Sequence, residues 1–296
     1  MNYSTLGRSD LRVSEIGFGC MSLEQNQNDN THLIHQAIDH GINFFDTADR
    51  YDKGWNETTL GHALKGKRDD VIIATKVGHQ WNESDGAWEW RPTKQHILKA
   101  VDQSLGRLQT DRIDLYQLHG GTIDDPIDEI IDAFEILKKK GKIRFYGISS
   151  IRPNVIREYA ERADIVSVMM QYSLLDRRPE EYCLGMLEDS DISVIARGSL
   201  AKGLLIDKPP SSCFGYDQED VAAMQKALDE TGNAIGASIQ FVLQQPAISV
   251  AAVGIRTEKQ LKEVLNAYSL KVSKVHLEKL AGMLKANVYE KHRLIQ

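Results

Sequence analysis

The sequence predicts a (β/α)8 TIM barrel, the α/β fold in which eight parallel strands close on themselves inside a ring of helices. Short runs rich in β-branched residues recur along the chain, and each precedes a longer stretch with helical spacing of apolar residues. The length of 296 residues suits one such barrel, since eight units need about 250 residues. We therefore expect residues 1–296 to form a single barrel domain.

The strands of this barrel are expected at residues 16–20, 43–46, 71–76, 113–119, 143–149, 165–171, 192–196 and 249–254. An open, doubly wound sheet is the alternative arrangement of the same units. Such a sheet usually carries a G-x-G-x-x-G turn after its first strand, and the stretch GFGCM at 17–21 lacks the third glycine. The absence of a long linker between units also favours the closed barrel.

Four segments lie outside the repeated units. Residues 3–6 and 11–13 flank the turn sequence GRSD, which predicts an N-terminal hairpin that caps the closed end of the barrel. Residues 78–91 and 206–216 have the composition of functional loops, and the first carries three tryptophans. The alternative for 78–91 is a loop that folds back on its own tryptophans. An amphipathic stretch at 275–287 predicts an extra C-terminal helix.

Two of the helices have clear start signals. Thr93 is expected to begin a helix whose buried face is Ile97, Leu98, Val101, Leu105 and Leu108. Asp125 is expected to cap a second helix, with Pro126 at its first position and Gly141 beyond its end.

Composition narrows the function classes. The 36 basic and 42 acidic residues give a net charge of −6 without a basic stripe, so nucleic acid is an unexpected partner. No signal-peptide core and no long apolar run is present, so we expect a cytoplasmic chain that does not bind a membrane. Cys20, Cys183 and Cys213 lie far apart, which favours reduced thiols over disulfides, and we expect no structural metal.

Polar residues end nearly every predicted strand. In barrels of this class chemistry occurs at the carboxyl ends of the strands. Each residue has a structural explanation on its own, as a strand end, a turn residue or a core histidine. Together they place an acid, an ammonium and an imidazole on neighbouring strands, which predicts an active site. The strand-end residues are Asp46, Lys76, His119, Ser149, Gln171, Arg197 and Arg256.

Tyr51 lies five residues after Asp46, in a loop that can fold over the mouth of the barrel. An unperturbed phenol has a pKa of about 10, and a nearby ammonium favours the phenolate. Lys76 can be that ammonium, Asp46 can hold it protonated, and His119 can donate a hydrogen bond to a carbonyl oxygen. Such a site gives a proton to a carbonyl whose carbon receives hydride, and hydride requires a cofactor because no side chain supplies it.

These residues resemble the aldo-keto reductase family from Gly17 nearly to the end of the chain. The most specific stretch is DTADRYDKGWNETTLGHAL at 46–64, followed by ATK ending at Lys76 and DLYQLH ending at His119. The resemblance implies that Asp46, Tyr51, Lys76 and His119 form a catalytic tetrad with Tyr51 as the general acid. It also implies NADPH as the cofactor.

The resemblance assigns the cofactor site residue by residue. It places Cys20 and Met21 beside the nicotinamide and has Ser149 and Gln171 bind its carboxamide. The segment ARGSLAKGLL resembles a phosphate-covering turn, and VGIRTEKQLKEV resembles the binding site for the adenosine half. From these two segments the implied cofactor residues are Arg197, Gly198, Ser199, Leu200, Gly203, Gly254, Ile255, Arg256, Gln260 and Glu263.

Arg256 favours NADPH because a guanidinium can hold the 2′-phosphate with two parallel hydrogen bonds; its alternative is a surface pair with Glu258. Several positions depart from the family pattern. Arg197 replaces a common aromatic residue, Ser150 and Val264 replace common asparagines, and Gly120 follows His119 where a bulky residue is usual. They bear on cofactor affinity and substrate shape.

The predicted function is NADPH-dependent reduction of aldehydes or ketones, small-molecule carbonyl substrates, to alcohols. One alternative is a cofactor-binding redox sensor or accessory subunit with little turnover. Another is an unrelated barrel hydrolase or isomerase that uses Asp46 and His119 directly. Oligomeric state and substrate identity do not follow from the sequence. Candidate pocket walls are Trp81, Trp88, Trp90, Phe214 and Tyr216.

Overall fold

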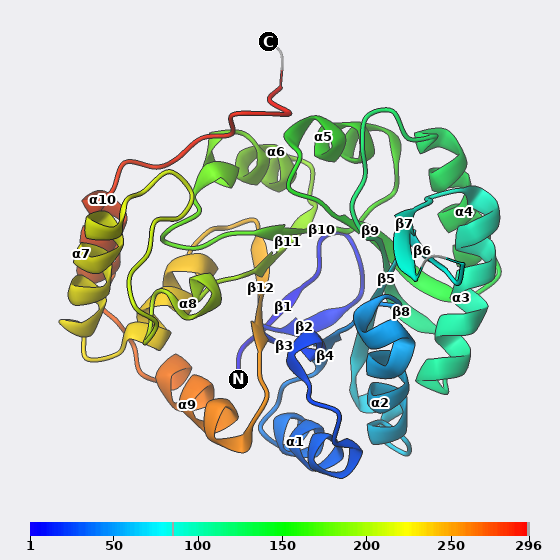
Figure 1. Cartoon of the computed structure of the whole chain (residues 1–296), viewed down its shortest axis with the longest axis horizontal. Helices are drawn as coiled ribbons and strands as arrows, with labels where there is room; N and C mark the ends of the chain where they lie inside the picture. The colour runs from blue at the N-terminus through cyan, green and yellow to red at the C-terminus, as the bar shows by residue number, and fades with distance from the viewer. Residues whose placement is uncertain (85, 295–296) are drawn as a thin grey trace.

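The computed structural model describes residues 1–84 and 86–294, and its centre is a closed barrel of eight parallel strands (Figure 1). Closure is shown by the last strand pairing with the first, from Ala251 with Ile16 to Gly254 with Gly19. The predicted (β/α)8 barrel is therefore confirmed, and the open sheet is excluded. Around the barrel the strands are β3 (Ile16–Gly19), β4 (Phe44–Asp46), β5 (Ile72–Val77), β8 (Ile113–Leu118), β9 (Ile143–Ser149), β10 (Ser167–Gln171), β11 (Ser193–Arg197) and β12 (Ile248–Gly254).

A hairpin closes the amino end of the barrel, as predicted. Strands β1 (Tyr3–Thr5) and β2 (Arg12–Ser14) pair antiparallel, and the hairpin buries Leu6, Leu11 and Val13 against the barrel interior. The backbone N–H of Gly7 donates to Ser193 Oγ at 2.6 Å, which ties the hairpin turn to β11. Substrate access is consequently left to the opposite, carboxyl end.

Helices surround the barrel and bury apolar faces against it. They are α1 (Gln27–Asp39), α2 (Trp55–Ala63), α3 (Lys94–Leu108), α4 (Ile127–Lys139), α5 (Pro153–Arg162), α6 (Cys183–Asp189), α7 (Gln218–Asp229), α8 (Ala234–Leu243), α9 (Glu258–Ser269) and α10 (Lys274–Met283). Short 3-10 helices lie at η1 (Cys20–Ser22), η2 (Tyr51–Gly54), η3 (Arg68–Asp70), η4 (Arg178–Glu181) and η5 (Ala201–Gly203). None of the helices described is long and apolar enough to cross a membrane.

The start of α3 is as predicted, and that of α4 is not. Thr93 Oγ1 accepts the backbone N–H of His96, so the predicted cap of α3 is confirmed. Helix α4 begins at Ile127 with Pro126 as its N-cap and no side-chain cap. The Asp125 carboxylate instead accepts the backbone N–H of Thr122 at 2.6 Å and the indole N–H of Trp90 at 3.0 Å. Because the Asp125 carboxylate binds Trp90 and Thr122, it does not cap the helix.

Residues 78–91 form more than the predicted loop. Strands β6 (His79–Asn82) and β7 (Ala87–Trp90) pair antiparallel into a hairpin that lies to one side of the barrel centre in the view of Figure 1. Trp81 and Trp88 occupy directly opposite positions, with ring centroids 5.4 Å apart. The alternative of a segment folded back on its own tryptophans is therefore the better description for these two residues.

The carboxyl-terminal half contains two further departures. Helices α7 and α8 both lie between β11 and β12, so one unit holds a helix that the eightfold pattern did not predict. The predicted C-terminal helix exists as α10 but ends at Met283 instead of 287. Residues after Met283 run as an extended segment, in which Asn287 donates to the backbone of Leu175 and Phe214. Those contacts replace further helical hydrogen bonds.

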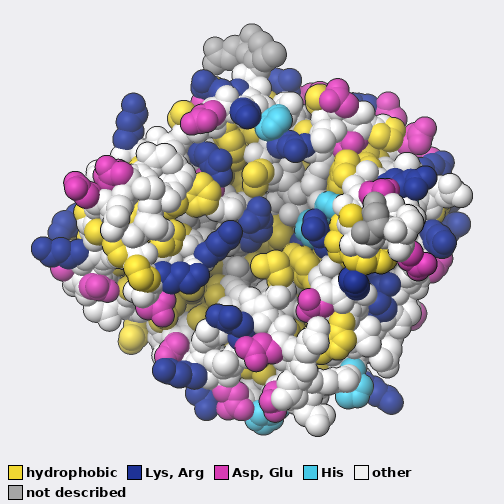
Figure 2. All heavy atoms as spheres, in the orientation of Figure 1, with side chains coloured by type: hydrophobic (Ala, Val, Ile, Leu, Met, Phe, Trp, Pro, Cys, Tyr) yellow, Lys and Arg dark blue, Asp and Glu magenta, His cyan; other side chains and the backbone are white. Residues whose placement is uncertain are grey.

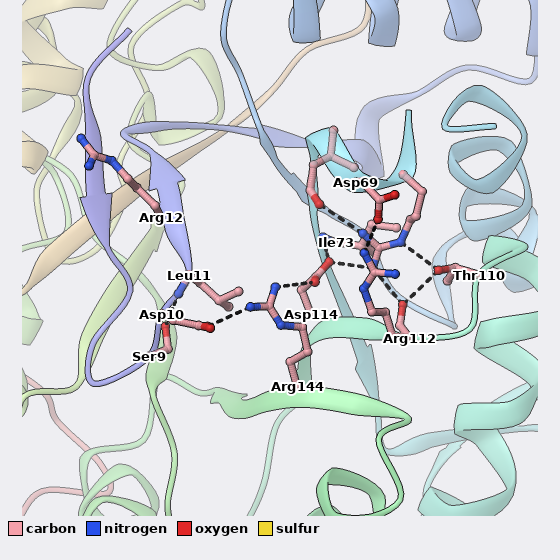
Figure 3. A network of polar contacts seen from close by, with 12 residues as sticks. Ser9, Asp10, Leu11, Arg12, Asp69, Ile73, Thr110, Arg112, Asp114 and Arg144 are labelled. Atoms are coloured by element: carbon pink, nitrogen blue, oxygen red, sulfur yellow. Dashed lines mark hydrogen bonds and ion pairs between the residues drawn. The ribbon is translucent and has the colours of Figure 1, made fainter. Parts of the chain in front are cut away.

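A buried carboxylate organises the amino end (Figure 3). Asp114 on β8 lies 2.7 Å from the Arg68 guanidinium and 3.1 Å from that of Arg144, and it also accepts the backbone N–H of Ile73 at 2.9 Å. Arg144 reaches on to Asp10 in the hairpin turn at 2.8 Å. The network joins strands and turn at the end of the barrel opposite the strand-end residues described next.

Candidate active site

Four of the predicted residues converge at the carboxyl end of neighbouring strands. Asp46 is the last residue of β4, Lys76 lies at the end of β5, and His119 directly follows β8. Tyr51 begins η2, the short helix that follows β4. These strands are adjacent in the barrel, since β4 pairs with β5 and β5 with β8. Strand pairing in the barrel thus brings together residues as far apart in the sequence as Asp46 and His119, which are separated by 73 positions.

Lys76 is the centre of the cluster and is fully buried. Its Nζ lies 2.7 Å from the Asp46 carboxylate and 2.7 Å from the carbonyl oxygen of Thr47, and it lies 3.4 Å from Tyr51 Oη. Burial opposes the charged form of Lys76, but the Asp46 carboxylate and the Tyr51 oxygen outweigh it, and the pKa of the ammonium is raised. A permanent positive charge therefore lies beside the phenol oxygen.

His119 lies on the other side of Tyr51, with ring centroids 5.8 Å apart and the rings edge to face. Burial and the Lys76 ammonium lower the pKa of His119 to about 2. The imidazole is consequently neutral at working pH and keeps one N–H donor and one acceptor. Its buried Nδ1 has no hydrogen-bond partner among the residues described.

A layer of polar residues beneath the cluster was missed by the sequence analysis. Asn56 on α2 accepts the Thr47 hydroxyl at 2.7 Å and donates to the carbonyl of Cys20 at 2.7 Å. Glu57, its neighbour, accepts the Thr75 hydroxyl at 2.6 Å and pairs with the Arg107 guanidinium at 2.7 Å. These bonds hold the segments that carry Asp46, Tyr51 and Lys76. The signal was present in the quoted stretch 46–64, where NE begins the helix, but nothing local shows that these side chains point inward.

The predicted nicotinamide-side residues lie at the ends of β9, β10 and β11 and in η1, which follows β3. Arg197 at the end of β11 donates to the Gln171 side chain at the end of β10 at 3.1 Å. Ser149 ends β9 and is half-buried. Met21 is exposed, whereas Cys20 is fully buried with its thiol turned toward the carbonyl of Phe18, and burial raises the pKa of that thiol. Only Met21 of that pair offers a side chain to a ligand.

The predicted phosphate-covering segment forms a turn that suits close backbone approach. Gly198 has φ +74°, and a Cβ there would stand 3.2 Å from the Gln171 side chain. Ser199 follows with a buried hydroxyl that has no partner among the residues described. Gly203 ends η5 and adopts φ +93°. Leu200 precedes that helix and packs against the hydrophobic core.

The predicted adenosine-side residues begin where β12 ends. A Cβ at Gly254 would stand 2.6 Å from Ser22 Oγ, and Ile255 is buried beneath the turn. Arg256 is exposed, with its backbone N–H bound to Gln260 Oε1 at 2.9 Å. Its alternative partner, Glu258, pairs instead with Lys262 at 3.7 Å and with His32 at 3.3 Å, and Glu263 pairs with Lys259.

These residues fit a nicotinamide dinucleotide. An orphaned buried hydroxyl at Ser199, a glycine turn at Gly198 and the cationic side chains of Arg197 and Arg256 are the donor set that a pyrophosphate and a further phosphate require. Figure 2 shows the face of the molecule seen in Figure 1, and its centre is hollowed, with Lys and Arg side chains and a histidine beside the hollow.

Only part of the predicted pocket wall lies near the tetrad. Trp90 packs edge-on against His79 with ring centroids 5.0 Å apart, and His79 in turn packs against His119. Trp81 and Trp88 pair with each other farther out on the hairpin. Phe214 packs against the Arg178 guanidinium at 5.2 Å. Tyr216 is buried, and its hydroxyl donates to the carbonyl of Lys285. The C-terminal segment thus contacts Tyr216, whose role as a pocket wall stays a prediction.

The sequence matches the model of the aldo/keto reductase family over residues 15–285. The chain belongs to this family. Members of the family are oxidoreductases that use nicotinamide cofactors. The uncharacterized oxidoreductase YqkF of Bacillus subtilis is 46% identical, with 99% of this chain and 100% of that protein covered.

Solved structures of this aldo/keto reductase fold agree closely with the chain. The holo form of aldo-keto reductase AKR11C1 from Bacillus halodurans matches with a TM-score of 0.94 at 45% identity, covering 99% of this chain and 100% of that one. The apo form of the same protein gives a TM-score of 0.88 over the same shares of each chain, at 44% identity. The glycerol dehydrogenase AKR11B4 from Gluconobacter oxydans gives 0.83 at 25% identity, covering 95% of this chain and 94% of that one.

Proposed function

We propose that the protein reduces aldehydes or ketones to alcohols with NADPH, and that Tyr51 gives the proton to the substrate oxygen. The observation that carries the proposal is the buried chain from Asp46 through Lys76 to Tyr51, with Nζ 2.7 Å from the carboxylate and 3.4 Å from the phenol oxygen. If the Asp46–Lys76 pair only stabilised the fold, it would have no need of the Tyr51 phenol at the mouth of the barrel.

Each residue has a separate part in this scheme. When bound, the reduced nicotinamide supplies hydride to the carbonyl carbon. Tyr51 Oη transfers its proton to the carbonyl oxygen, and the Lys76 ammonium stabilises the phenolate until solvent returns a proton. Neutral His119 donates a hydrogen bond that orients the carbonyl. Asp46 keeps Lys76 charged and in place.

The preference for NADPH over NADH rests on Arg256. Its guanidinium is exposed after β12, is not paired with Glu258, and has the planar donor geometry that a 2′-phosphate accepts. A relative from Schizosaccharomyces pombe that is 34% identical over 65% of this chain carries the name aldo-keto reductase yakc [NADP(+)]. A cytosolic location belongs to the same proposal, and the three free thiols fit a reducing compartment.

The test is NADPH oxidation, followed by absorbance, with a panel of aromatic and aliphatic aldehydes. We expect turnover by the parent protein and a fall in kcat of at least about 100-fold in Tyr51→Phe, because general acid catalysis contributes about that much or more. NADPH binding, followed by tryptophan fluorescence, should be retained. Binding without turnover in the parent would favour the redox sensor, and no binding would exclude both functions.

A further inference from the structure

Arg50 is a guanidinium without a counter-ion at the mouth of the barrel. It directly precedes Tyr51 and is half-buried. Its Nη1 lies 3.1 Å from Nε2 of His79, and its other N–H groups have no partner among the residues described. Two other half-buried arginines differ, since Arg107 and Arg178 each hold a buried carboxylate at 2.7 Å. Arg197, which also holds no carboxylate in the described part of the chain, donates to the Gln171 side chain.

His79 connects this guanidinium to the reacting groups. Its ring lies edge-on to that of His119 with centroids 5.6 Å apart, and His119 lies beside Tyr51. Burial and the Arg50 charge lower the pKa of His79 to about 4, so the imidazole is neutral and accepts the Arg50 N–H. These contacts form a row that runs from the unpaired Arg50 cation through His79 and His119 to the proton donor Tyr51.

Among the described residues, no carboxylate lies within ion-pair distance of the Arg50 guanidinium. The carboxyl of Asp49 interacts with Glu57, Arg107 and Lys76 beneath the loop. The ammonium of Lys53 lies 3.8 Å from the centre of the Trp81 ring and adds a second cation to this rim. A half-buried guanidinium is stabilised by an anion that accepts two parallel hydrogen bonds. The substrate is the component that can bring one.

We infer that Arg50 binds a carboxylate carried by the substrate a few bonds from its carbonyl group, so that the preferred substrates are oxo acids or formyl carboxylic acids. The inference rests on the proposed reductase function and concerns the substrate side of the same site. His79 positions the guanidinium, and His119 and Tyr51 face the carbonyl oxygen at the other end of the row.

The experiment compares matched substrates that differ in one charge. Initial rates are measured with 3- and 4-carboxybenzaldehyde and with the methyl ester of each, at saturating NADPH. We expect a higher kcat/KM for at least one acid than for its ester. Arg50→Gln should lower that acid-to-ester ratio about 10-fold or more, mainly through KM, because hydrogen bonds between charged groups are stronger than those between neutral groups. Arg50→Lys keeps the charge and loses the planar guanidinium. Its acid-to-ester ratio should lie between that of the parent and that of Arg50→Gln.

The control is Arg12→Gln, which removes the same charge from an exposed position in the hairpin at the closed end (Figure 3). Its acid-to-ester ratio should equal that of the parent. An equal ratio in the parent and in Arg50→Gln, with both proteins folded by circular dichroism, would overturn the inference.

Equilibrium binding separates the two levels of the proposal. Calorimetric binding of 4-hydroxymethylbenzoate, the alcohol that corresponds to 4-carboxybenzaldehyde, is measured with the parent and with Arg50→Gln. Binding that depends on Arg50, in a protein that turns over none of the aldehydes, would support the carboxylate site and refute the reductase. If the protein turned over the esters and bound 4-hydroxymethylbenzoate equally well with and without Arg50, the reductase would be supported and the carboxylate site refuted.

Discussion

Two buried carboxyl groups near Tyr51, Asp46 of the tetrad and Asp49, differ in their partners. The Asp46 carboxylate faces the Lys76 ammonium at 2.7 Å. Asp49, three residues later, is buried without a cation in contact, and its Oδ1 has no partner among the residues described. Burial and the neighbouring Glu57 carboxylate raise the pKa of Asp49 to about 8. A residue two positions from Tyr51 thus limits the stability of the loop that carries it.

Asp49→Asn tests this at the level of one residue. Folded Asp49 keeps its proton up to about pH 8, whereas the unfolded chain loses it near pH 4, so the stabilisation by this proton is complete below about pH 4 and is lost as the pH rises to 8. Relative to the parent, the Asn variant should therefore gain unfolding free energy from pH 5 to 8 and level off above 8. One pKa unit corresponds to about 1.4 kcal/mol of unfolding free energy, so even part of the Asp49 shift would give a measurable difference between the two proteins.

Urea unfolding at pH 5, 7 and 9 measures the difference. Asp52→Asn removes an exposed carboxylate from the same loop and controls for the loss of one negative charge. A stability difference between parent and Asp49→Asn that is constant across the three pH values would contradict the assignment.

Among the elements, the closing hairpin and strand β8 depend on one buried acid. Asp114→Ala would leave Arg68 half-buried without its partner and would free the backbone N–H of Ile73. Removing one partner of a buried pair costs about 3–5 kcal/mol, so we expect a loss of that order in unfolding free energy. Asp10→Ala removes only an exposed partner of Arg144 and should cost less than about 1 kcal/mol. Equal losses in urea unfolding would show that burial of Asp114 is unimportant.

At the scale of the whole molecule, a cofactor that spans the mouth from β9 to β12 would link most of the barrel. Ligand at 100 times its Kd stabilises a fold by about 2.7 kcal/mol. We expect NADPH to raise the melting temperature by at least about 3 °C and NADH to raise it less. Arg256→Ala should remove more of the NADPH shift than of the NADH shift. Lys259→Ala, a nearby exposed cation on α9, is the control, and equal loss of both shifts in Arg256→Ala would argue against binding of the 2′-phosphate.

Features with a local cause were predictable from the sequence. The alternation of β-branched runs with amphipathic helices predicts the closed barrel, because each unit can bury its apolar face only against its neighbours. In such a barrel the carboxyl ends of the strands meet, so the sequence alone predicts that Asp46, Lys76 and His119 lie together. Thr93 as a helix cap also depends on its immediate neighbours alone.

Features whose cause lies far away in the chain could be established only from the tertiary structure. Asp125 does not cap α4 because its carboxylate binds Trp90, 35 positions earlier. The hydroxyl of Tyr216 binds the backbone of Lys285, 69 positions later. Arg50 meets His79 across 29 positions, and Asn56 meets the carbonyl of Cys20 across 36. Periodicity and capping patterns record what neighbouring residues do to the backbone. They carry no information on which distant side chain will satisfy a polar group, and that pairing is settled only when the barrel closes.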